Sequence, residues 1–323
     1  MTDFGFEDYE EIKEPEVVED NYEVEIPEEP KTKIGDIYKL GDHIVMCGDS
    51  TELKDVEKLC GGGTELDLFF TDPPYNVDIG GLIDSEPNGI RTNNKRVSDG
   101  IENDNMEESK FYNFLLKTFN NAKQVLKEGG AFYIFHASRF QKTFENTLEE
   151  NDLQVKEQLI WVKNTFVIGR QDYQWQHEPC FYGWKSGASH YFIDKRNIPT
   201  IIEDKLDFEK MKKEDMKKIL EEIYSEKLPT TIVRENKPVR SDLHPTMKPI
   251  KLCARLIQNS TKPGESVLDL FGGSGSTLIA CEQLGRKCYM MEYDPHYVDV
   301  IINRWEDFTG QKAVKLWAKE KSS

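Results

Sequence analysis

The segment Asp72-Pro73-Pro74-Tyr75 combines residue types that could activate a nitrogen atom. It directly follows the apolar run Leu66–Thr71, which has the length of a buried strand. The Asp72 carboxylate and the Pro73 carbonyl are two acceptors on a backbone that the prolines hold rigid. Acceptors fixed on both N–H bonds of a planar amino group localise its lone pair and make the nitrogen a nucleophile. Tyr75 offers a flat face to a base, although the same string also fits a rigid loop with a capping Asp.

A glycine-rich turn forms a second candidate site. It follows the apolar run Ser266–Leu270 and precedes a predicted helix, so its backbone and the free N–H groups of the helix could face a ligand. Glu292 comes 20 residues after Gly272, at the end of the next predicted strand, where a carboxylate accepts hydrogen bonds from ribose hydroxyls. The turn suits an adenosyl group better than a dinucleotide; a turn without ligand is the alternative. The predicted binding residues are Asp269, Gly272, Gly273, Gly275, Ser276, Thr277 and Glu292.

The elements that would position these turns alternate between strands and helices along the chain. This alternation predicts an α/β fold with a doubly wound, mostly parallel sheet. We expect Gly129-Gly130 to end a helix over 107–127, and residues 76–106 to form a long loop. The predicted strands are 43–49, 66–71, 131–135, 159–162, 180–184, 266–270 and 288–293, and the other predicted helices are 51–59, 138–151, 204–227, 249–260, 276–284 and 295–307.

Composition narrows the class of protein. The 323 residues carry a net charge of −17, of which −10 lies in residues 1–33, so we expect an acidic, disordered tail there. Such a tail either aids solubility or regulates a nucleic-acid cleft. The six cysteines show no CxxC spacing and indicate neither a zinc site nor a disulfide framework, so no metal is predicted. No run approaches the roughly 20 apolar residues of a membrane span.

Taken together, the motifs resemble the permuted, beta-type DNA amino-methyltransferases of bacteria and phages. In that family the catalytic half precedes the cofactor half, and the order of DPPY at 72–75 and FGGSG at 271–275 is the same. The resemblance covers residues 34–310 and includes Gly48-Asp49-Ser50, the segment 159–183 and His244–Pro249. It implies a Rossmann-like methyltransferase fold, S-adenosylmethionine as methyl donor, and transfer to adenine N6 after the base is flipped from the duplex.

The resemblance also implies individual roles. Asp49 would contact the adenine ring of the cofactor, although with Glu52 it equally fits a helix capping box. Thr246 and Lys248 match the cofactor-end motif, where a cation meets the methionine carboxylate, and Phe271 would pack near the cofactor; a solvated lysine is the alternative for Lys248. The aromatic residues Tyr173, Trp175 and His177 fall in the segment that lines the base pocket, and Cys180 is expected in a buried strand.

These expectations divide the chain into a tail (1–33), a catalytic half (34–185), a target-recognition insertion (186–243), a cofactor half (244–310) and a C-terminal tail (311–323). The predicted partner is double-stranded DNA, and the predicted location is the cytoplasm, for a bacterial or phage-encoded protein. Homodimerisation and a cognate restriction endonuclease stay open, as does an ordinary surface-loop role for 91–96. The predicted DNA contacts are Arg91, Asn93, Lys95, Arg96, Lys195, Arg196 and Arg240.

Three alternatives accompany this prediction. Methylation of cytosine N4 uses the same chemistry. The resemblance favours adenine, because the resembled family more often pairs an Asp in this turn with adenine and a Ser with cytosine N4. A methyltransferase acting on RNA or on a protein amide could also use such a turn. A non-catalytic DNA-binding regulator could keep the fold, but the intact Asp72, glycine turn and Glu292 argue against it.

Overall fold

The computed structural model describes residues 14–20, 22–63, 65–76, 106–163, 172–193, 232–234 and 247–316. They form one sheet with the strand order β10-β1-β2-β9-β8-β3-β4-β6-β5-β7. The strands are β1 (Ile37–Leu40), β2 (His43–Cys47), β3 (Leu66–Thr71), β4 (Leu126–Phe135), β5 (Val155–Val162), β6 (His177–Trp184), β7 (Ile232–Arg234), β8 (Ser266–Asp269), β9 (Lys287–Glu292) and β10 (Val314–Leu316).

The centre of the sheet, from β2 through β9, β8 and β3 to β4, is parallel. The flanking pairs β1–β2, β1–β10, β4–β6 and β5–β6 are antiparallel, whereas β7 pairs with β5 in parallel. From β8 the chain crosses by a helix to β9 on one side, and from β3 it crosses to β4 on the other. The order in which the chain adds strands therefore reverses between the parallel strands β8 and β3. In α/β proteins, ligands bind at the carboxyl ends of the strands at such a point. The predicted fold class is confirmed.

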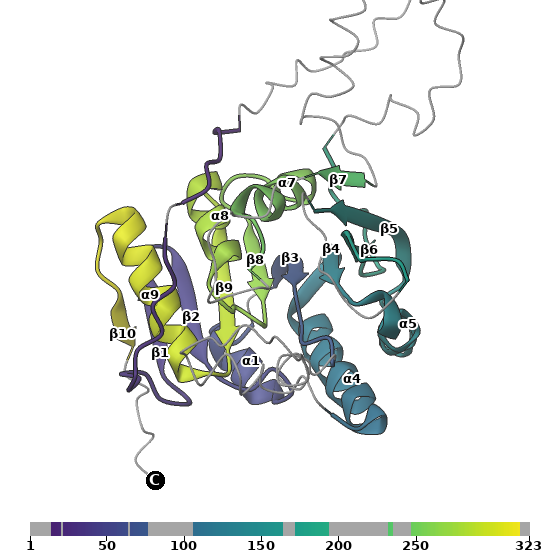
Figure 1. Ribbon diagram of the computed structural model, residues 1–323, viewed down its shortest axis with the longest axis horizontal. Helices are drawn as coiled ribbons and strands as arrows, with labels where there is room; N and C mark the ends of the chain where they lie inside the picture. The colour runs from purple at the N-terminus through teal and green to yellow at the C-terminus, as the bar shows by residue number, and fades with distance from the viewer. Residues whose placement is uncertain are drawn as a thin grey trace, which may run out of the picture.

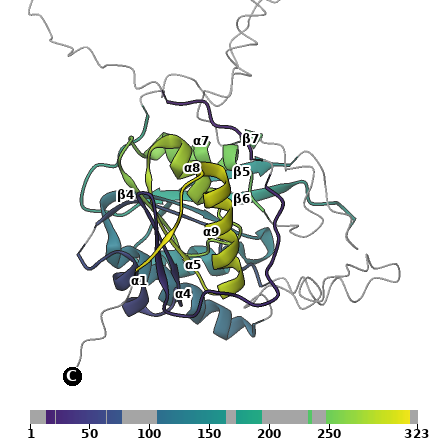
Figure 2. The same ribbon diagram turned by 90° about the vertical axis from the view of Figure 1, so that its left-hand side faces the viewer.

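Helices cover both faces of the sheet. On one face lie α1 (Leu53–Leu59), α4 (Glu108–Val125) and α5 (Gln141–Glu150), which is preceded by the short 3-10 turn Ser138–Phe140; on the other lie α7 (Ile250–Ser260), α8 (Ser276–Leu284) and α9 (Pro295–Thr309). Figure 2 shows α7 and α8 above the sheet and α1 and α4 below it. Alternate residues of β4 supply the two cores: Tyr133 and Phe135 face one, Phe132 and Ile134 the other. None of the described helices is long and apolar enough to cross a membrane.

One expected element needs correction, and two strands were not expected. The helix before β4 ends at Val125, and Gly129 and Gly130 lie inside the strand instead of ending the helix. Gly129 has φ +74°, and a Cβ there would lie 2.5 Å from the Ser189 carbonyl oxygen, so this glycine permits a close backbone approach. The edge strands β1 and β10 were not predicted; β10 lies within the supposed C-terminal tail and pairs with β1.

The acidic N-terminal segment also differs from its prediction. Composition predicts disorder over residues 1–33, whereas the structure shows residues 14–20 and 22–33 as an extended segment that passes beside α8 and α9 before entering β1 (Figure 1). We call these residues the N-terminal strap. The predicted helix over 204–227 and most of the long loop over 76–106 lie outside the described residues.

Candidate active site

The two candidate turns lie side by side because β3 pairs with β8. Leu68 and Phe69 align with Val267 and Leu268, so the carboxyl ends of both strands reach the same edge of the sheet. A hydrogen bond of 3.1 Å from the Thr71 hydroxyl to the Asp269 carboxylate joins these ends directly, across 198 residues of the chain. Two segments that are distant in sequence thus form one site at the point where the strand order reverses.

Asp72 stands at the centre of the first turn, with both carboxylate oxygens engaged. Its Oδ2 accepts a hydrogen bond of 2.6 Å from the Lys248 ammonium, and its Oδ1 accepts one from the Tyr75 hydroxyl. Pro73 is buried, and its ring fixes the backbone of the turn. The rest of the Lys248 ammonium faces the rings of Phe135 (4.9 Å) and Tyr75 (5.6 Å), so aromatic faces surround the charge.

Glu178, at the start of β6, is a second carboxylate in this site. It lies 2.9 Å from the Lys248 ammonium and also pairs with Lys163. Burial opposes ionisation of Glu178, but the ammonium groups of Lys248 and Lys163 hold its pKa down at about 2. Asp72 behaves in the opposite way: burial raises its pKa, against the pull of Lys248, and the charge of Glu178 raises it further. Asp72 is therefore the more basic of the two carboxylates.

The second turn is shaped by hydrogen bonds of its own backbone. Gly272 donates to the Met291 carbonyl (2.8 Å) and Gly275 donates to Gly272 (2.8 Å), which brings the chain round into α8. Gly273 and Gly275 have φ of +50° and +86°, a conformation that favours glycine. A Cβ on Gly272 would lie 2.8 Å from the Met290 side chain, so the turn packs tightly on β9. Asp269 accepts from the Phe271 amide (3.1 Å) and the Thr277 hydroxyl, and burial raises its pKa to about 7.

Glu292 ends β9 beside this turn. Its carboxylate accepts hydrogen bonds from the amides of Gly273 (2.8 Å) and Asp294 (2.9 Å), while burial raises its pKa to about 7. A carboxylate oxygen has more than one acceptor position, so Glu292 can also accept from ribose hydroxyls. A Cβ at Gly273 would meet nothing within 4 Å, which shows open space over the turn. The residues present therefore fit an adenosyl ligand.

Asp49 and Phe271 complete the edge of this second turn. The Gly48 amide donates to the Glu292 carbonyl (3.1 Å), which brings Asp49 to the same edge of the sheet. The Asp49 carboxylate accepts from the amide and the hydroxyl of Thr51 (both 2.8 Å), and Glu52 makes no side-chain cap on α1, so the capping box is not formed. Phe271 packs against Phe114 of α4, with 5.8 Å between ring centroids.

The other predicted residues fall into three groups. Lys248 lies with the catalytic turn, since its ammonium contacts Asp72. The side chains of Tyr173 and Trp175 are 91% and 46% exposed, and Trp175 packs edge-on against His177 (5.3 Å); Cys180 is buried in β6 as expected. Outside the described residues lie Thr246, Arg91, Asn93, Lys95, Arg96, Lys195, Arg196 and Arg240. In the described part of the chain no cluster of His, Cys, Asp or Glu could hold a metal.

Sequence reasoning missed Glu178, Lys163 and Arg304. Glu178 belongs to the segment 159–183 that carries the resemblance, so a charged residue beside a predicted strand end was a usable signal. No signal in the sequence pointed to Arg304. It lies in the middle of α9, and its side chain donates to the Ser274 carbonyl (2.9 Å), a contact that only the fold creates.

Comparisons with known proteins agree with this geometry. A family model described as DNA methylase matches residues 66–304. The type II methyltransferase M2.MboI of Moraxella bovis is 28% identical over 247 residues, which are 76% of this chain and 82% of that protein. The DNA adenine methyltransferase YhdJ of Escherichia coli K12 is 25% identical over 259 residues, 78% of this chain and 80% of that protein.

Two solved structures share the fold. The crystal structure of the M1.HpyAVI–SAM complex superposes with a TM-score of 0.53 at 21% identity, covering 80% of this chain and 98% of the other. The PvuII DNA methyltransferase, described as cytosine-N4-specific, superposes with a TM-score of 0.54 at 16% identity, covering 83% of this chain and 89% of the other. At these identities the likeness concerns the fold alone.

Proposed function

The chain belongs to the DNA methylase family, and from this membership we propose that it transfers the methyl group of S-adenosylmethionine to adenine N6 in double-stranded DNA. The observation that carries the proposal is the contact between the ends of β3 and β8, which places Asp72 beside the glycine turn. Family relatives support it, among them the adenine-specific protein of Escherichia coli.

In the proposed reaction the chain's residues prepare the target nitrogen. The Asp72 carboxylate and the Pro73 carbonyl accept hydrogen bonds from the exocyclic amino group of a flipped base, and this localises its lone pair. The amino group approaches Asp72 as a further donor, which the carboxylate oxygens can accept beside Lys248 and Tyr75. The Lys248 ammonium already lies 2.9 Å from Glu178, so it can shift toward Glu178 and make room for the base. The raised pKa of Asp72 makes it able to take the proton that the nitrogen loses on methylation.

Binding of the methyl donor is assigned to the second turn. Bound S-adenosylmethionine supplies an electrophilic methyl group on a sulfonium. Glu292 would accept hydrogen bonds from its ribose hydroxyls, the backbone of Gly272 and Gly273 would approach it closely, and Asp49 would face its adenine edge. These assignments are supported by the open space at Gly273 and by the remaining acceptor positions of Glu292.

DNA recognition is assigned to the parts of the chain that carry the predicted basic contacts. We propose that residues 91–96, in the segment after the catalytic turn, contact phosphates and base edges, and that residues 186–243 recognise the target sequence. The domain limits predicted from the sequence are kept as part of this proposal. The exceptions are the two predicted tails, because the N-terminal one contains the ordered strap and the C-terminal one contains β10. A cytoplasmic location follows from the substrate, and pairing with a restriction endonuclease is suggested by the type II relatives. The homodimer remains a prediction from the resemblance.

The decisive experiment identifies the modified nucleoside. The protein is incubated with isotope-labelled S-adenosylmethionine and unmethylated DNA, the DNA is digested, and the nucleosides are analysed by mass spectrometry. We expect N6-methyladenine, and no product from Asp72→Ala although this variant still binds the methyl donor. Cytosine N4 is the second candidate because the fold is shared with a cytosine-N4-specific enzyme; N4-methylcytosine would reverse the base assignment. Methylation of RNA or protein instead of DNA would refute the proposal.

A further inference from the structure

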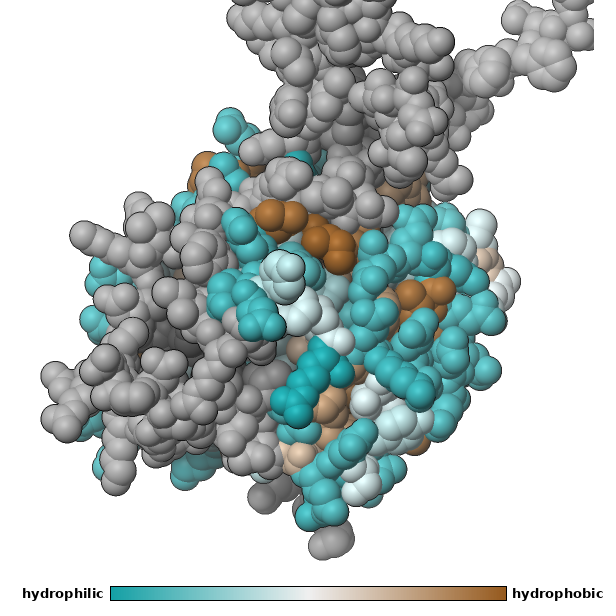
Figure 3. All heavy atoms as spheres, turned by 45° about the vertical axis from the view of Figure 1, so that its right-hand side comes forward, coloured by the Kyte–Doolittle hydropathy of each residue, from teal (hydrophilic) through white to brown (hydrophobic). Residues whose placement is uncertain are grey.

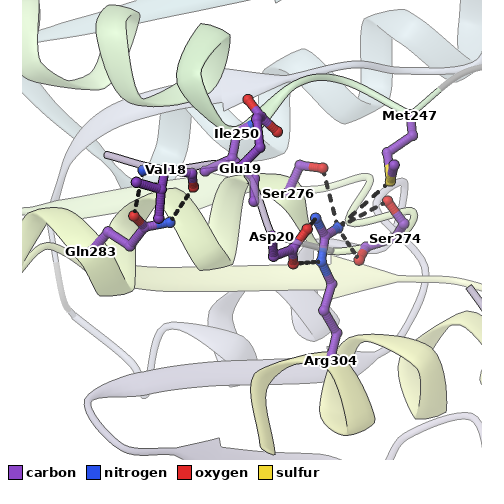
Figure 4. Close-up of polar contacts among 9 residues, drawn as sticks. All are labelled: Val18, Glu19, Asp20, Met247, Ile250, Ser274, Ser276, Gln283 and Arg304. Carbon is purple, nitrogen blue, oxygen red and sulfur yellow. Dashed lines mark hydrogen bonds and ion pairs between the residues drawn. The ribbon is translucent and has the colours of Figure 1, made fainter. Parts of the chain in front are cut away.

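The N-terminal strap makes specific contacts with the part of the molecule that forms the active site. Val18 and Gln283 of α8 bond in both directions, from the Val18 amide to Gln283 Oε1 (2.9 Å) and from Gln283 Nε2 to the Val18 carbonyl (2.9 Å). This pairing fixes the path of the chain immediately before Glu19 and Asp20. Figure 4 shows how the three residues cross between α7, α8 and α9.

Asp20 holds Arg304 of α9 by a two-point ion pair. Arg304 Nε lies 2.6 Å from Oδ2 and its Nη2 lies 2.9 Å from Oδ1, and only 1% of the arginine is exposed. The remaining nitrogen, Nη1, donates to the carbonyl of Ser274 (2.9 Å) and lies 3.2 Å from the Ser276 hydroxyl (Figure 4). The strap therefore reaches the backbone of the glycine turn through one arginine.

Glu19, the adjacent residue, caps α7. Its two carboxylate oxygens accept from the amides of Ile250 (3.0 Å) and Lys251 (2.8 Å), the first turn of the helix. The residue at the start of α7 is Pro249, which has no side-chain oxygen to offer these amides. Lys248, which bonds Asp72, is only two residues before Ile250. The position of the lysine backbone thus depends on where Glu19 anchors the helix.

We propose that Glu19 and Asp20 are positioning residues for methyl transfer: Asp20 fixes the glycine turn through Arg304, and Glu19 fixes Lys248 through the start of α7. Two neighbouring residues of a remote segment thereby hold the glycine turn and the ammonium that bonds the catalytic carboxylate. Methyl transfer depends strongly on such distances, because reacting groups must meet in line. The proposal rests on the function proposed above and adds a role for the acidic N-terminus.

The chain offers a matched control for Asp20. Glu14, also in the strap, makes a two-point ion pair with Arg286, with both contacts at 2.6 Å and the arginine side chain fully buried. Arg286 donates to the Thr261 carbonyl (2.8 Å) and immediately precedes β9. It therefore lies at the amino end of this strand, whereas the site lies at the carboxyl ends. Removal of either carboxylate leaves a buried arginine without its ionic partner, so both variants lose stability. Only the removal of Asp20 should alter the glycine turn.

The first test compares Asp20→Asn with Glu14→Gln in the full chain, below the unfolding temperature of both. We expect Asp20→Asn to raise the Kd for S-adenosylhomocysteine, measured by titration calorimetry, and the KM for S-adenosylmethionine about 5- to 30-fold. Asp20→Glu should restore much of the affinity. Glu14→Gln should lower the unfolding midpoint while leaving both constants as in the wild type. Equal affinity in Asp20→Asn and wild type, or an equal decrease in both variants, would overturn the role of Asp20.

The second test addresses Glu19. Glu19→Gln keeps one acceptor oxygen but removes the charge that stabilises the start of α7. We expect kcat to fall and the acid limb of the pH–rate profile to move, because Lys248 shifts against Asp72, while the Kd for S-adenosylhomocysteine stays the same. An unchanged kcat and pH profile would overturn the role of Glu19. Wild-type protein that binds S-adenosylhomocysteine but methylates no DNA would instead refute the proposed function, so the two failures are distinguishable.

Discussion

At the scale of single residues, the site is defined by competition for Asp72. Lys248 and Tyr75 both donate to this carboxylate, and Lys248 has a second acceptor in Glu178. In the proposed reaction the substrate amino group would join the Lys248 ammonium as a donor to this carboxylate. Of the four residues, Asp72 and Tyr75 were predicted from the DPPY string, because both lie in one short turn whose position after a buried strand is visible in the sequence. The roles of Glu178 and Lys248 toward Asp72 arise from long-range packing, which no local pattern encodes.

The charge of Glu178 should be visible in the pH dependence of catalysis. Glu178 raises the pKa of Asp72, so Glu178→Gln should lower that pKa. Asp72 must be ionised to accept from the amino group, and activity declines as pH falls through its pKa. We therefore expect the acid limb of the kcat profile to move to lower pH in Glu178→Gln. An acid limb that stays in place or moves to higher pH would show that Asp72 does not control it.

Glu292 predicts a pH dependence of cofactor binding. Burial raises its pKa from 4.5 to about 7, so without ligand it is half protonated near neutrality. We expect the affinity for S-adenosylhomocysteine to rise between about pH 6 and pH 8, with proton release seen by calorimetry in buffers of different ionisation enthalpy. Glu292→Gln should weaken binding about 10- to 100-fold, because it removes hydrogen bonds to a charged group. It should also reduce the pH dependence.

The same carboxyl affects stability, with a sign that follows from its raised pKa. The folded protein keeps the proton up to about pH 7, whereas the unfolded chain releases it near 4.5. Between these values the folded state binds more protons, so the free energy of unfolding falls as pH rises through this window. Glu292→Gln removes this part of the fall; a pH dependence of the urea midpoint identical to wild type would contradict the assignment.

At the scale of elements, buried parallel strands were predicted best. The limits of β3 and α8 match their predictions, because a continuous apolar run and a glycine turn mark them clearly. The strands β1 and β10 were missed since they are short and carry few buried residues. Gly129 and Gly130 were misread as a helix stop, because a glycine at a close backbone contact looks the same in sequence as one at a helix end.

Close packing of the glycine turn on β9 yields a prediction at this scale. A Cβ at Gly272 would lie 2.8 Å from both Cγ and Sδ of Met290 and 3.0 Å from Ile301 Cδ1. Gly272→Ala should lower the free energy of unfolding by about 1–3 kcal/mol and weaken cofactor binding, because the turn must move outward. Gly285→Ala is the control: it strains the end of α8 (φ +64°) in open space, so it should cost stability only. Unaltered cofactor affinity in Gly272→Ala would contradict the packing argument.

At the scale of the whole molecule, part of the negative charge lies in ion pairs with buried arginines. The chain carries −17, yet acidic residues of the strap neutralise two buried arginines instead of remaining in solvent. Composition could not reveal this, because a run of Glu and Asp with few large apolar residues looks disordered unless its distant partners are known. Among the residues coloured in Figure 3, hydrophilic ones predominate and hydrophobic ones form small separate groups.

A net negative enzyme must bind DNA through local basic residues, and this gives a prediction about salt. We expect Arg91→Gln, Lys95→Gln and Arg96→Gln each to weaken binding to all DNA sequences alike. For each phosphate that is no longer neutralised, the slope of log K against log salt should decrease by about 0.9. Fluorescence anisotropy at several salt concentrations measures both effects. Lys312→Gln, which removes an exposed lysine paired with Glu306, is the control and should leave the slope unchanged.

The strand order also has a consequence for synthesis of the protein. Strands β1 and β2 are synthesised early, but β2 pairs with β9 and β1 pairs with β10. These pairings cannot form until the last strands have been synthesised. Contacts between such distant segments form slowly, and the ribosome releases the chain from its N-terminus onward. Until β9 has emerged, the nascent chain lacks both Glu292 and the strand on which the glycine turn packs. A product that ends before β9 therefore cannot assemble the proposed methyl-donor site.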